Sequence, residues 1–562
     1  MNGTCKKGTK YMKFCDMPYE RLTLEEIQAA YAEMEHLAEC AETEADLKKI
    51  MELNHRLKEA MTAMELCYIR HQMNVNDVFY AQEQDYYDEI NPRICELSNH
   101  FTEKMLASPV ADAYKKLIGP QAAAMLECDR KGINGEVVSL MQEENSLTEQ
   151  YRKLVSNATV LWEGEKINRA LMSQYVQSTD RETRRKATLA ISASWEEQRE
   201  EIEEIYDRLV KNRDSQARAL GYENFVDLSY VRMYRIGYDK KQVERFREEA
   251  KRELVPVYVR MQEEKRKRLQ LEHLYSYDNA INFLEGNPVP NGDARRCMEY
   301  AREVFTKLSP ETAEFIGKFM EDEVYDVEMR DGKAGGGFMT MLPKYKMPFI
   351  FANFDGTTEN AYVMAHEGGH AFQGYLKRNE EISEHSQVTS EVAESHAMAM
   401  EFFVLPYMDT YFGERAGDYV TMHLEGAVNR ILYQCEQDEF QQLVYENPGM
   451  SKEERNRLWK KLEQDYFPGR DHGENENLRE GRAWQRIPHT FYWPFYAIDY
   501  GLAQVIALEY RKMRKKDSQA AWQSYLWFCE NSGMMSFPEL VKGAKLKSPF
   551  EEGALCGLFE EA

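Results

Sequence analysis

One short motif constrains this chain more than any other feature of its sequence. His366 and His370 stand four residues apart in the segment HEGGH, and residues 361–373 around them have the composition of one helix. Residues four apart on a helix share a face, so the two imidazoles are predicted to point at one place. Two imidazole nitrogens begin a zinc site, and Glu367 follows the first histidine, where a carboxylate takes the proton of the attacking water. The motif predicts metal ligands at His366 and His370 and a general base at Glu367.

Chance is a poor explanation of this motif. The chain has 12 histidines in 562 residues, and about 0.03 random HExxH matches are expected from such a composition. The structural alternative is a buried helix whose histidines bond to backbone carbonyls. Gly368 and Gly369 argue against an ordinary helix, because a glycine inside a helix costs about 1 kcal/mol relative to alanine. We expect a neighbouring strand or the substrate to approach the backbone closely there.

Composition indicates that the rest of the chain is mainly α-helical. Only 17 prolines and 31 glycines interrupt 562 residues, and good helix formers dominate long stretches. A break in the pattern near residue 180 divides a helical N-terminal region, 1–180, from a catalytic region, 181–562. Apolar periodicity predicts helices at 47–67, 78–106, 110–128, 136–157, 164–176, 182–220 and 239–273, with turns at Asn91–Pro92 and Lys131–Gly132.

Charge and cysteine usage narrow the range of partners and compartments. The formal net charge of −24 argues against nucleic acid or an anionic membrane as the main partner. The ten cysteines are scattered singly, without a CxxC pair, which favours reduced thiols in the cytoplasm. No leader-like segment and no run of 18 apolar residues is present, so we expect neither secretion nor membrane insertion.

Strand signals concentrate just before the HEGGH segment and predict a small sheet beside the metal-binding helix. Gly335, Gly336 and Gly337 lie between two of these strands. They form either a flexible turn or the approach to an edge strand that binds a peptide in extended form. The strands are expected at Val324–Arg330, Phe338–Leu342 and Phe349–Phe351.

The third metal ligand is not determined by spacing. In one class of zinc proteases a third histidine follows the second by six residues, but Leu376 stands at that position. A helix is predicted at 391–403, and a glutamate from it would complete a set of two histidines and one carboxylate, with the fourth position left for water. Spacing alone does not choose between Glu391 and Glu394, and His385 and His396 are the other candidates. The structural alternative is that these glutamates form ordinary surface salt bridges.

With these residues the chain resembles the thimet oligopeptidase and oligoendopeptidase F family of zinc metallopeptidases. The resemblance spans most of the chain and is most specific at 349–373, 390–396 and 488–501. In that family the third zinc ligand is a glutamate of the second helix, with another acidic residue seven positions later. Glu394 followed by Glu401 matches this pattern, so the resemblance implies Glu394 as the third ligand.

The segment Ile487–Tyr500 is similar to the family's transition-state loop. The resemblance implies that His489 and Tyr496 steady the oxyanion that forms during peptide hydrolysis. Tyr492 and Tyr500, together with the three glycines, are expected to contact substrate. The alternative for the tyrosines is aromatic core packing. One departure stands out: many relatives have a histidine where this chain has Gln373, so no role is carried over to that residue.

We therefore predict a mainly α-helical zinc endopeptidase that hydrolyses short, unstructured peptides, with one Zn²⁺ per chain and Glu367 as the base. The resemblance implies a deep substrate channel. A zinc carboxypeptidase is the nearest alternative, and it would need a cationic group to hold a free C-terminal carboxylate. A non-catalytic helical peptide-binding protein is the alternative from another class, against which the intact Glu367 argues.

Overall fold

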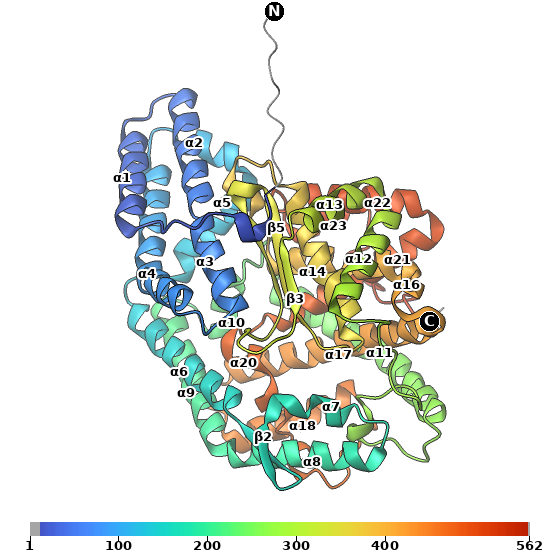
Figure 1. Cartoon of the computed structure of the whole chain (residues 1–562). Helices are drawn as coiled ribbons and strands as arrows, with labels where there is room; N and C mark the ends of the chain where they lie inside the picture. The colour runs from blue at the N-terminus through green and yellow to red at the C-terminus, as the bar shows by residue number, and fades with distance from the viewer. Residues whose placement is uncertain (1–11, 560–562) are drawn as a thin grey trace, which may run out of the picture.

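The computed structural model describes residues 12–559, and Figure 1 shows three regions built almost entirely from helices. The N-terminal bundle, at the left of the view, consists of the first five helices. Its helices begin where the sequence offers caps: Thr23 accepts a hydrogen bond from the backbone N–H of Glu26, and the Glu26 side chain accepts one from the N–H of Thr23. The bundle contains α1 (Leu24–Cys40), α2 (Glu44–Ala60), α3 (Thr62–Met73), α4 (Val78–Ala107) and α5 (Ala111–Gly132).

Two local expectations fail in the bundle. The single helix predicted over 47–67 breaks at Met61, so its apolar positions are divided between α2 and α3. The turn predicted at Asn91–Pro92 is absent, because α4 runs through Pro92. Ile90 and Ile94 on either side of the proline are both buried. Packing of this continuous apolar stripe outweighs the local preference of Asn-Pro for a turn.

A lower lobe follows the bundle in the chain. The helix predicted over 164–176 is largely wrong: β1 and β2 form an antiparallel hairpin in which Trp162 pairs with Glu165. Glu163 and Gly164, between them, both have positive φ, which is the geometry of a two-residue hairpin turn. The elements of this stretch are α6 (Val138–Ser156), β1 (Thr159–Trp162), β2 (Glu165–Asn168), α7 (Ser173–Val176), α8 (Arg181–Glu197) and α9 (Arg199–Ala219).

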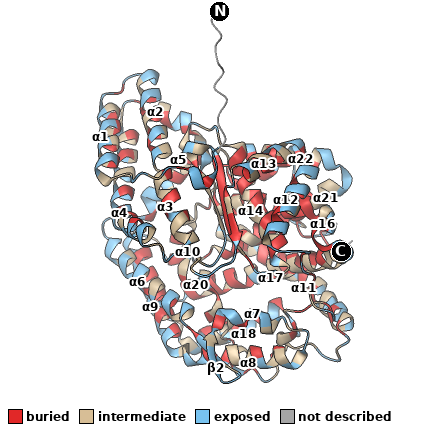
Figure 2. Cartoon of the chain, in the orientation of Figure 1, coloured by how far each residue is buried: buried red, intermediate tan, exposed pale blue. Residues whose placement is uncertain are grey.

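The small sheet lies directly against the helix that carries the HEGGH motif, as predicted. Its strand order is β3-β5-β4, with β3 parallel and β4 antiparallel to the central β5. Almost every residue of β5 is buried (Figure 2). The elements are α10 (Phe225–Arg232), α11 (Lys240–Arg268), α12 (Ala294–Leu308), α13 (Pro310–Glu321), β3 (Tyr325–Glu328), β4 (Phe338–Leu342), β5 (Met347–Phe354) and α14 (Glu359–Leu376).

The remaining helices enclose α15, which is buried over nearly its whole length. Its buried residues include Glu391, Glu394 and Glu401 as well as apolar side chains, and α14 and α21 pack against it. In residues 12–559 no helix is both long and apolar enough to cross a membrane. The elements are α15 (Ser390–Val404), α16 (Asp409–Phe412), α17 (Ala416–Glu446), α18 (Lys452–Tyr466), α19 (Glu476–Arg479), α20 (Pro488–Tyr492), α21 (Ala497–Lys516), α22 (Ser518–Asn531) and α23 (Phe537–Gly543).

Candidate functional site

Helix α14 presents His366 and His370 on one face, with ring centroids 5.0 Å apart. The two glycines between the histidines are required for a different reason from the one that the sequence suggested. A Cβ at Gly368 would lie 2.6 Å from the Phe305 ring of α12, and one at Gly369 would lie 2.7 Å from the Cα of Ala397 in α15. The close neighbours are thus helices, and the expectation of a strand or of substrate is wrong. Bare backbone lets α15 approach α14 closely enough to bring a third polar group to the histidines.

That third group is Glu394 of α15. One donor atom each from His366, His370 and Glu394 lie within 4.8 Å of one another. The Oε2 atom of Glu394 is buried, lies 3.3 Å from His366 Nε2 and makes no hydrogen bond within the described part of the chain. Such a buried, unpartnered carboxylate oxygen beside two imidazoles is what a cation site provides. Two imidazoles and one carboxylate are a ligand set that zinc accepts, so these residues fit the metal.

None of the other candidates for the third ligand joins His366 and His370 in the cluster of donor atoms found among residues 12–559. The carboxylate of Glu391 points toward Arg235, with Oε2 3.7 Å from Nη1, and Arg235 also pairs with buried Asp499. His385 is in a short 3₁₀ turn, 3.5 Å from a carboxylate oxygen of Glu380. His396 is buried with its ring 5.4 Å from that of His370, and neither of its nitrogens has a hydrogen-bond partner among residues 12–559.

A second layer of polar groups holds the first histidine. His366 Nδ1 lies 2.7 Å from Oε1 of Glu401, which orients the ring so that Nε2 faces Glu394. His423 and Arg430 of α17 approach the other oxygen of Glu401, at 3.5 and 3.9 Å. Sequence reasoning missed both of these α17 residues. No local spacing links them to the HEGGH motif, because helix packing alone brings them there.

Burial and mutual charge shift the acidities in this cluster strongly. Burial raises the pKa of Glu367 to about 7. Burial also acts to raise the pKa of Glu394, but the interaction with His366, whose Nε2 lies 3.3 Å from Oε2, brings it to about 2. Burial lowers the pKa of His370 to about 4, with the charge of His366 as the second cause. The cluster therefore combines neutral and ionised groups within one buried site, a pattern typical of active sites.

The predicted transition-state loop reaches this cluster through Tyr496. Its hydroxyl donates a 2.8 Å hydrogen bond to Oε1 of Glu394, and burial raises its pKa. The rings of His489 and Tyr500 lie 5.2 and 5.3 Å from the Tyr496 ring. Tyr492 faces the other way: its ring contacts Tyr151 and the guanidinium of Arg152, both on α6.

The three glycines precede the edge strand β4 as expected. The carbonyl of Gly336 accepts a hydrogen bond from the side chain of Asn353, and Gly336 has a φ of +92°. A Cβ at Gly337 would lie 3.4 Å from the carbonyl oxygen of Phe351 and 4.0 Å from Val363 of α14. Gly335 and Gly336 are exposed. This strand edge and the metal-ligand cluster therefore belong to neighbouring elements.

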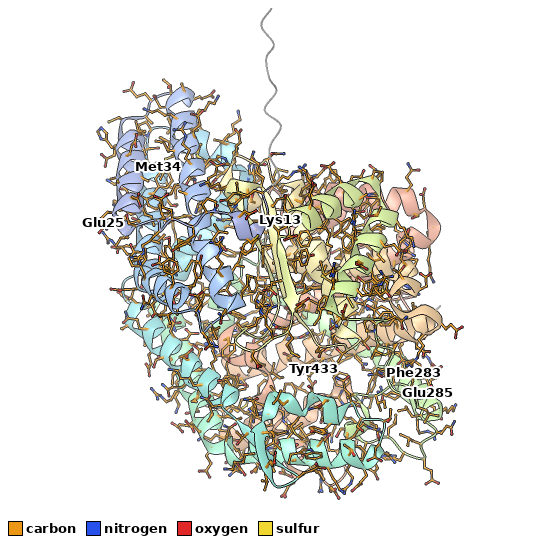
Figure 3. The ribbon with its side chains drawn as sticks, in the orientation of Figure 1. Lys13, Glu25, Met34, Phe283, Glu285 and Tyr433 are labelled. Carbon is orange, nitrogen blue, oxygen red and sulfur yellow. The ribbon has the colours of Figure 1, made fainter. Side chains whose placement is uncertain are left out.

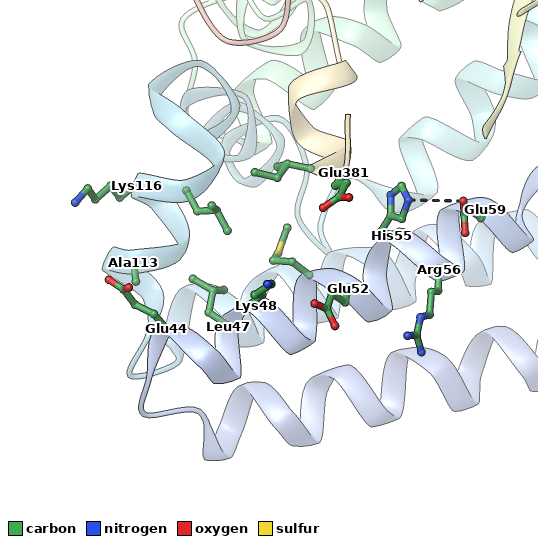
Figure 4. A pocket seen from close by; sticks show the side chains of 13 residues that line it. Glu44, Leu47, Lys48, Glu52, His55, Arg56, Glu59, Ala113, Lys116 and Glu381 are labelled. Carbon is green, nitrogen blue, oxygen red and sulfur yellow. Dashed lines mark ion pairs between the residues drawn. The ribbon is translucent and has the colours of Figure 1, made fainter. Parts of the chain in front are cut away.

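One sizeable cavity does not belong to this cluster. Its volume is about 790 Å³, and it lies between α2 and α5 of the bundle, beside Glu381 and Ile382 (Figure 4). Charged side chains such as Lys48 and Glu52 surround it, and none of the metal-ligand candidates lines it. A smaller cavity of about 570 Å³ is lined by Arg430, and so adjoins the site.

Comparison with known proteins identifies relatives of both parts of the chain. Residues 174–555 match the family described as Peptidase family M3, and residues 14–133 match the Peptidase M3 N-terminal domain. A solved structure described as a putative oligoendopeptidase F is 39% identical, with a TM-score of 0.90 and coverage of 98% of this chain and 97% of that chain. One described as PZ peptidase A with an inhibitor is 38% identical, with a TM-score of 0.90 and coverage of 97% and 98%.

A curated relative is more distant. The oligopeptidase PepF of Bacillus subtilis is 24% identical over 308 residues, which are 53% of this chain. The aligned part is 45% of the relative, so the match spans less than half of that protein's length.

Proposed function

The chain belongs to peptidase family M3, and from this membership and the geometry of the site we propose that it is a zinc-dependent endopeptidase that cuts short oligopeptides. The observation that carries the proposal is the convergence of His366, His370 and Glu394 within 4.8 Å of one another. Three protein ligands of this kind are typical of catalytic rather than structural zinc sites, because they leave a position for water or substrate.

One Zn²⁺ per chain would be held by these three residues. When bound, the ion supplies Lewis-acid chemistry, which makes water a better nucleophile and polarises the substrate's peptide carbonyl. The residues around the ligands maintain their orientation. Glu401 accepts a hydrogen bond from the Nδ1–H group of His366. This bond favours the tautomer whose Nε2 is free to bind the metal.

Glu367 is the proposed general base. It follows His366 on α14, is not one of the three ligand candidates, and its carboxylate is close enough for the charges of His366 and Glu394 to shift its pKa. In the proposed reaction this carboxylate accepts the proton of the attacking water and delivers it to the nitrogen of the leaving amine as the C–N bond breaks. The proton balance closes, and Glu367 returns to its starting state.

Tyr496 is proposed to stabilise the oxyanion with its hydroxyl. In the structure this hydroxyl donates to Glu394, one of the metal-ligand candidates, so it already lies beside the place where a bound carbonyl oxygen would develop charge. A donor that turns from Glu394 to the oxyanion strengthens its interaction in the transition state. His489, whose ring is next to that of Tyr496, is proposed as a second donor. Tyr500 and the segment Gly335–Gly337 are proposed to contact the peptide. The ring of Tyr492 contacts α6, so no contact with the peptide is proposed for it.

The substrates are proposed to be short, unstructured peptides in the cytoplasm, which reach the site through a channel between the bundle and the body of the molecule. We test the proposal with the purified full chain, its metal content measured, and a mixed peptide library whose cut bonds are mapped by mass spectrometry. Internal cuts that disappear with a chelator and return with zinc are expected.

The Glu367→Gln variant is the matched control. It should keep zinc and lose nearly all turnover, because an amide does not accept the water's proton. Turnover near that of the unsubstituted chain would remove Glu367 as the base. Removal of C-terminal residues only would indicate a carboxypeptidase, and an uncut library with bound zinc would contradict the proposed enzyme.

A further inference from the structure

A cavity of about 570 Å³ lies between α17 and the lower lobe. Tyr433, labelled in Figure 3, comes from α17 and lies above α7, α8 and α18 in that view. Five residues with ionisable side chains line the cavity: Arg430, Glu463, Arg470, His472 and Arg486. These come from separate parts of the sequence, so no motif indicates the cavity.

Arg430 connects this cavity to the candidate active site. Its Nη1 atom is 3.9 Å from Oε2 of Glu401, and Oε1 of the same carboxylate is 2.7 Å from Nδ1 of His366. Arg430, in the cavity wall, therefore contacts Glu401, the carboxylate that orients the ligand candidate His366. The candidate active site and the cavity are thus separated by one ion pair, Glu401–Arg430.

The cavity carries a surplus of positive charge. Its single acidic lining residue, Glu463, is already occupied: His472 Nε2 lies 2.8 Å from one oxygen and Arg470 Nη1 lies 3.2 Å from the other. Glu436, on the same helix as Tyr433, is fully buried, and burial raises its pKa well above the usual range. Its carboxyl therefore does not balance the arginines.

Among the cations that line the cavity, Arg486 has no acidic partner in residues 12–559. Its Nη2 donates to the Ser192 hydroxyl at 2.9 Å and to the Asn477 side chain at 2.7 Å. Its Nε is buried without a partner, and no carboxylate of residues 12–559 lies within 4.0 Å of the guanidinium. Arg169 stands over the ring of Trp195, which Arg486 also approaches, so a second cation is near. Burial and the charge of Arg169 lower the pKa of Arg486 to about 10.

An arginine in this setting costs folding energy, because its charge is partly removed from water and no carboxylate in the described chain balances it. The cost is explained if a ligand supplies the missing anion. The rest of the molecule is strongly acidic, with a net charge of −24, so a positive cavity next to the site is a local and selective feature.

We propose that this cavity binds a carboxylate of the peptide substrate, with Arg486 donating to it. The inference rests on the proposed function and names the substrate group that the site selects. Guanidinium groups bind carboxylates through two parallel hydrogen bonds. Every linear peptide with an unblocked C-terminus carries a carboxylate at that end. The side chain of an aspartate or glutamate in the peptide is the other group that could supply a carboxylate.

The test measures binding and does not depend on turnover. The zinc-loaded Glu367→Gln chain is titrated with one short neutral peptide, labelled at its N-terminus, in three forms: the free acid, the C-terminal amide, and the amide with one internal glutamate. Fluorescence anisotropy reports the Kd of each. The free acid is expected to bind about 10- to 100-fold more tightly than the amide, as for a hydrogen bond to a charged group.

Two variants locate the effect. Arg486→Gln should bring the Kd of the acid to that of the amide, while Arg486→Lys, which keeps the charge, should retain part of the difference. Arg482→Gln is the matched control, because Arg482 is four residues away, pairs with Glu196 at 3.3 Å and does not line this cavity. It should preserve the whole difference. Melting curves verify that each variant is folded.

The outcomes separate the two proposals. Equal or undetectable binding of acid and amide by the chain with Arg486 overturns the carboxylate site, as does a difference that survives in folded Arg486→Gln. If the amide with internal glutamate binds as tightly as the acid, the site takes a carboxylate from either source. A chain that binds the acid tightly but leaves every peptide uncut before Glu367 is replaced would overturn the proposed enzyme and leave the carboxylate site standing.

Discussion

The N-terminal bundle and the α14–α15 centre are both made of helices, yet they differ in whether their polar groups are solvated and hydrogen-bonded or buried without partners. In the bundle, charged pairs such as Lys104 and Glu39 are solvated at the surface, and capping boxes begin α1 and α2. In the centre, Glu394 Oε2 and both nitrogens of His396 are buried without hydrogen-bond partners in the described chain. Folding alone explains the first arrangement. The second costs stability, so it indicates a site where a ligand completes the structure.

Cavity size does not reveal this difference. The bundle holds the larger cavity, about 790 Å³, and its charged groups project into solvent from α2 and α5. The cavity beside α17 has about 570 Å³ and is lined by the Arg486 guanidinium, which has no acidic partner in the part of the chain that the structure describes. If Arg486 binds a substrate carboxylate as proposed, unsatisfied charge indicates a binding site better than volume does. Four substitutions test the contrast between bundle and centre, in order of decreasing expected effect.

The largest effect is expected from removing one carboxylate of α15. Glu394→Ala should reduce zinc affinity by more than about 10²-fold, since loss of a partner that only orients a ligand already costs 10- to 100-fold. Peptidase activity should fall with the metal. Glu391→Ala should keep the zinc, because its carboxylate faces Arg235 and not the histidines. Metal analysis after dialysis against buffered zinc measures both, and the reverse order would move the ligand to Glu391.

The next effect is kinetic. Tyr496→Phe should lower kcat by roughly 10²- to 10³-fold with little change in KM, because an oxyanion donor acts in the transition state and not in substrate binding. Tyr492→Phe is the matched control in the same loop, and its ring packs toward α6, so kcat should be unchanged. A role limited to packing would instead change the melting temperature of Tyr496→Phe and leave its kcat alone.

Sequence predicted most of the helical fold because amphipathic helices follow local rules. The predicted helix at 78–106 corresponds to α4 (Val78–Ala107), and the three strand signals correspond to β3, β4 and β5. The errors lie where packing overrides local preference. Pro92 is accommodated within α4, and the first residues of the 164–176 segment form part of a β-hairpin instead of a helix. The division near residue 180 remains a prediction.

The candidate site divides in the same way. His366 and His370 follow from spacing along one helix, and Glu394 had to come from a resemblance because Glu391 is equally compatible with spacing. The structure brings Glu394 to the histidines, but no sequence pattern could have indicated Arg486, whose neighbours Ser192 and Asn477 are 285 residues apart in the chain. Long-range packing decides such contacts, and a single sequence does not record it.

A smaller effect is expected from filling the space between two helices of the centre. In Gly369→Ala the new methyl group would meet the Cα of Ala397 at 2.7 Å and the Cβ of Met400 at 2.9 Å. The free energy of unfolding should fall by about 1–3 kcal/mol, and zinc affinity should fall too, because α15 must move away from α14.

Gly317→Ala provides the control for that substitution. Gly317 lies inside α13 with nothing within 4 Å of its would-be Cβ. Alanine there should stabilise the protein by about 0.5–1 kcal/mol through its higher helix propensity. Denaturant unfolding of both variants measures the contrast. A stabilised Gly369→Ala with full zinc affinity would show that close approach of α15 is not needed.

The smallest effect is expected in the bundle. Thr23→Ala removes the side chain that accepts the Glu26 N–H at 3.3 Å and leaves Glu26 Oε2 bonded only to the N–H of residue 23. Loss of such a cap should cost about 1 kcal/mol, while Thr23→Ser should retain the bond. Because α1 contributes no group to the metal-ligand cluster, kcat and KM should stay at their original values in both variants. If Thr23→Ala lowers kcat without lowering the melting temperature, the bundle takes part in catalysis, and the distinction between a region built for folding and a region built for binding fails.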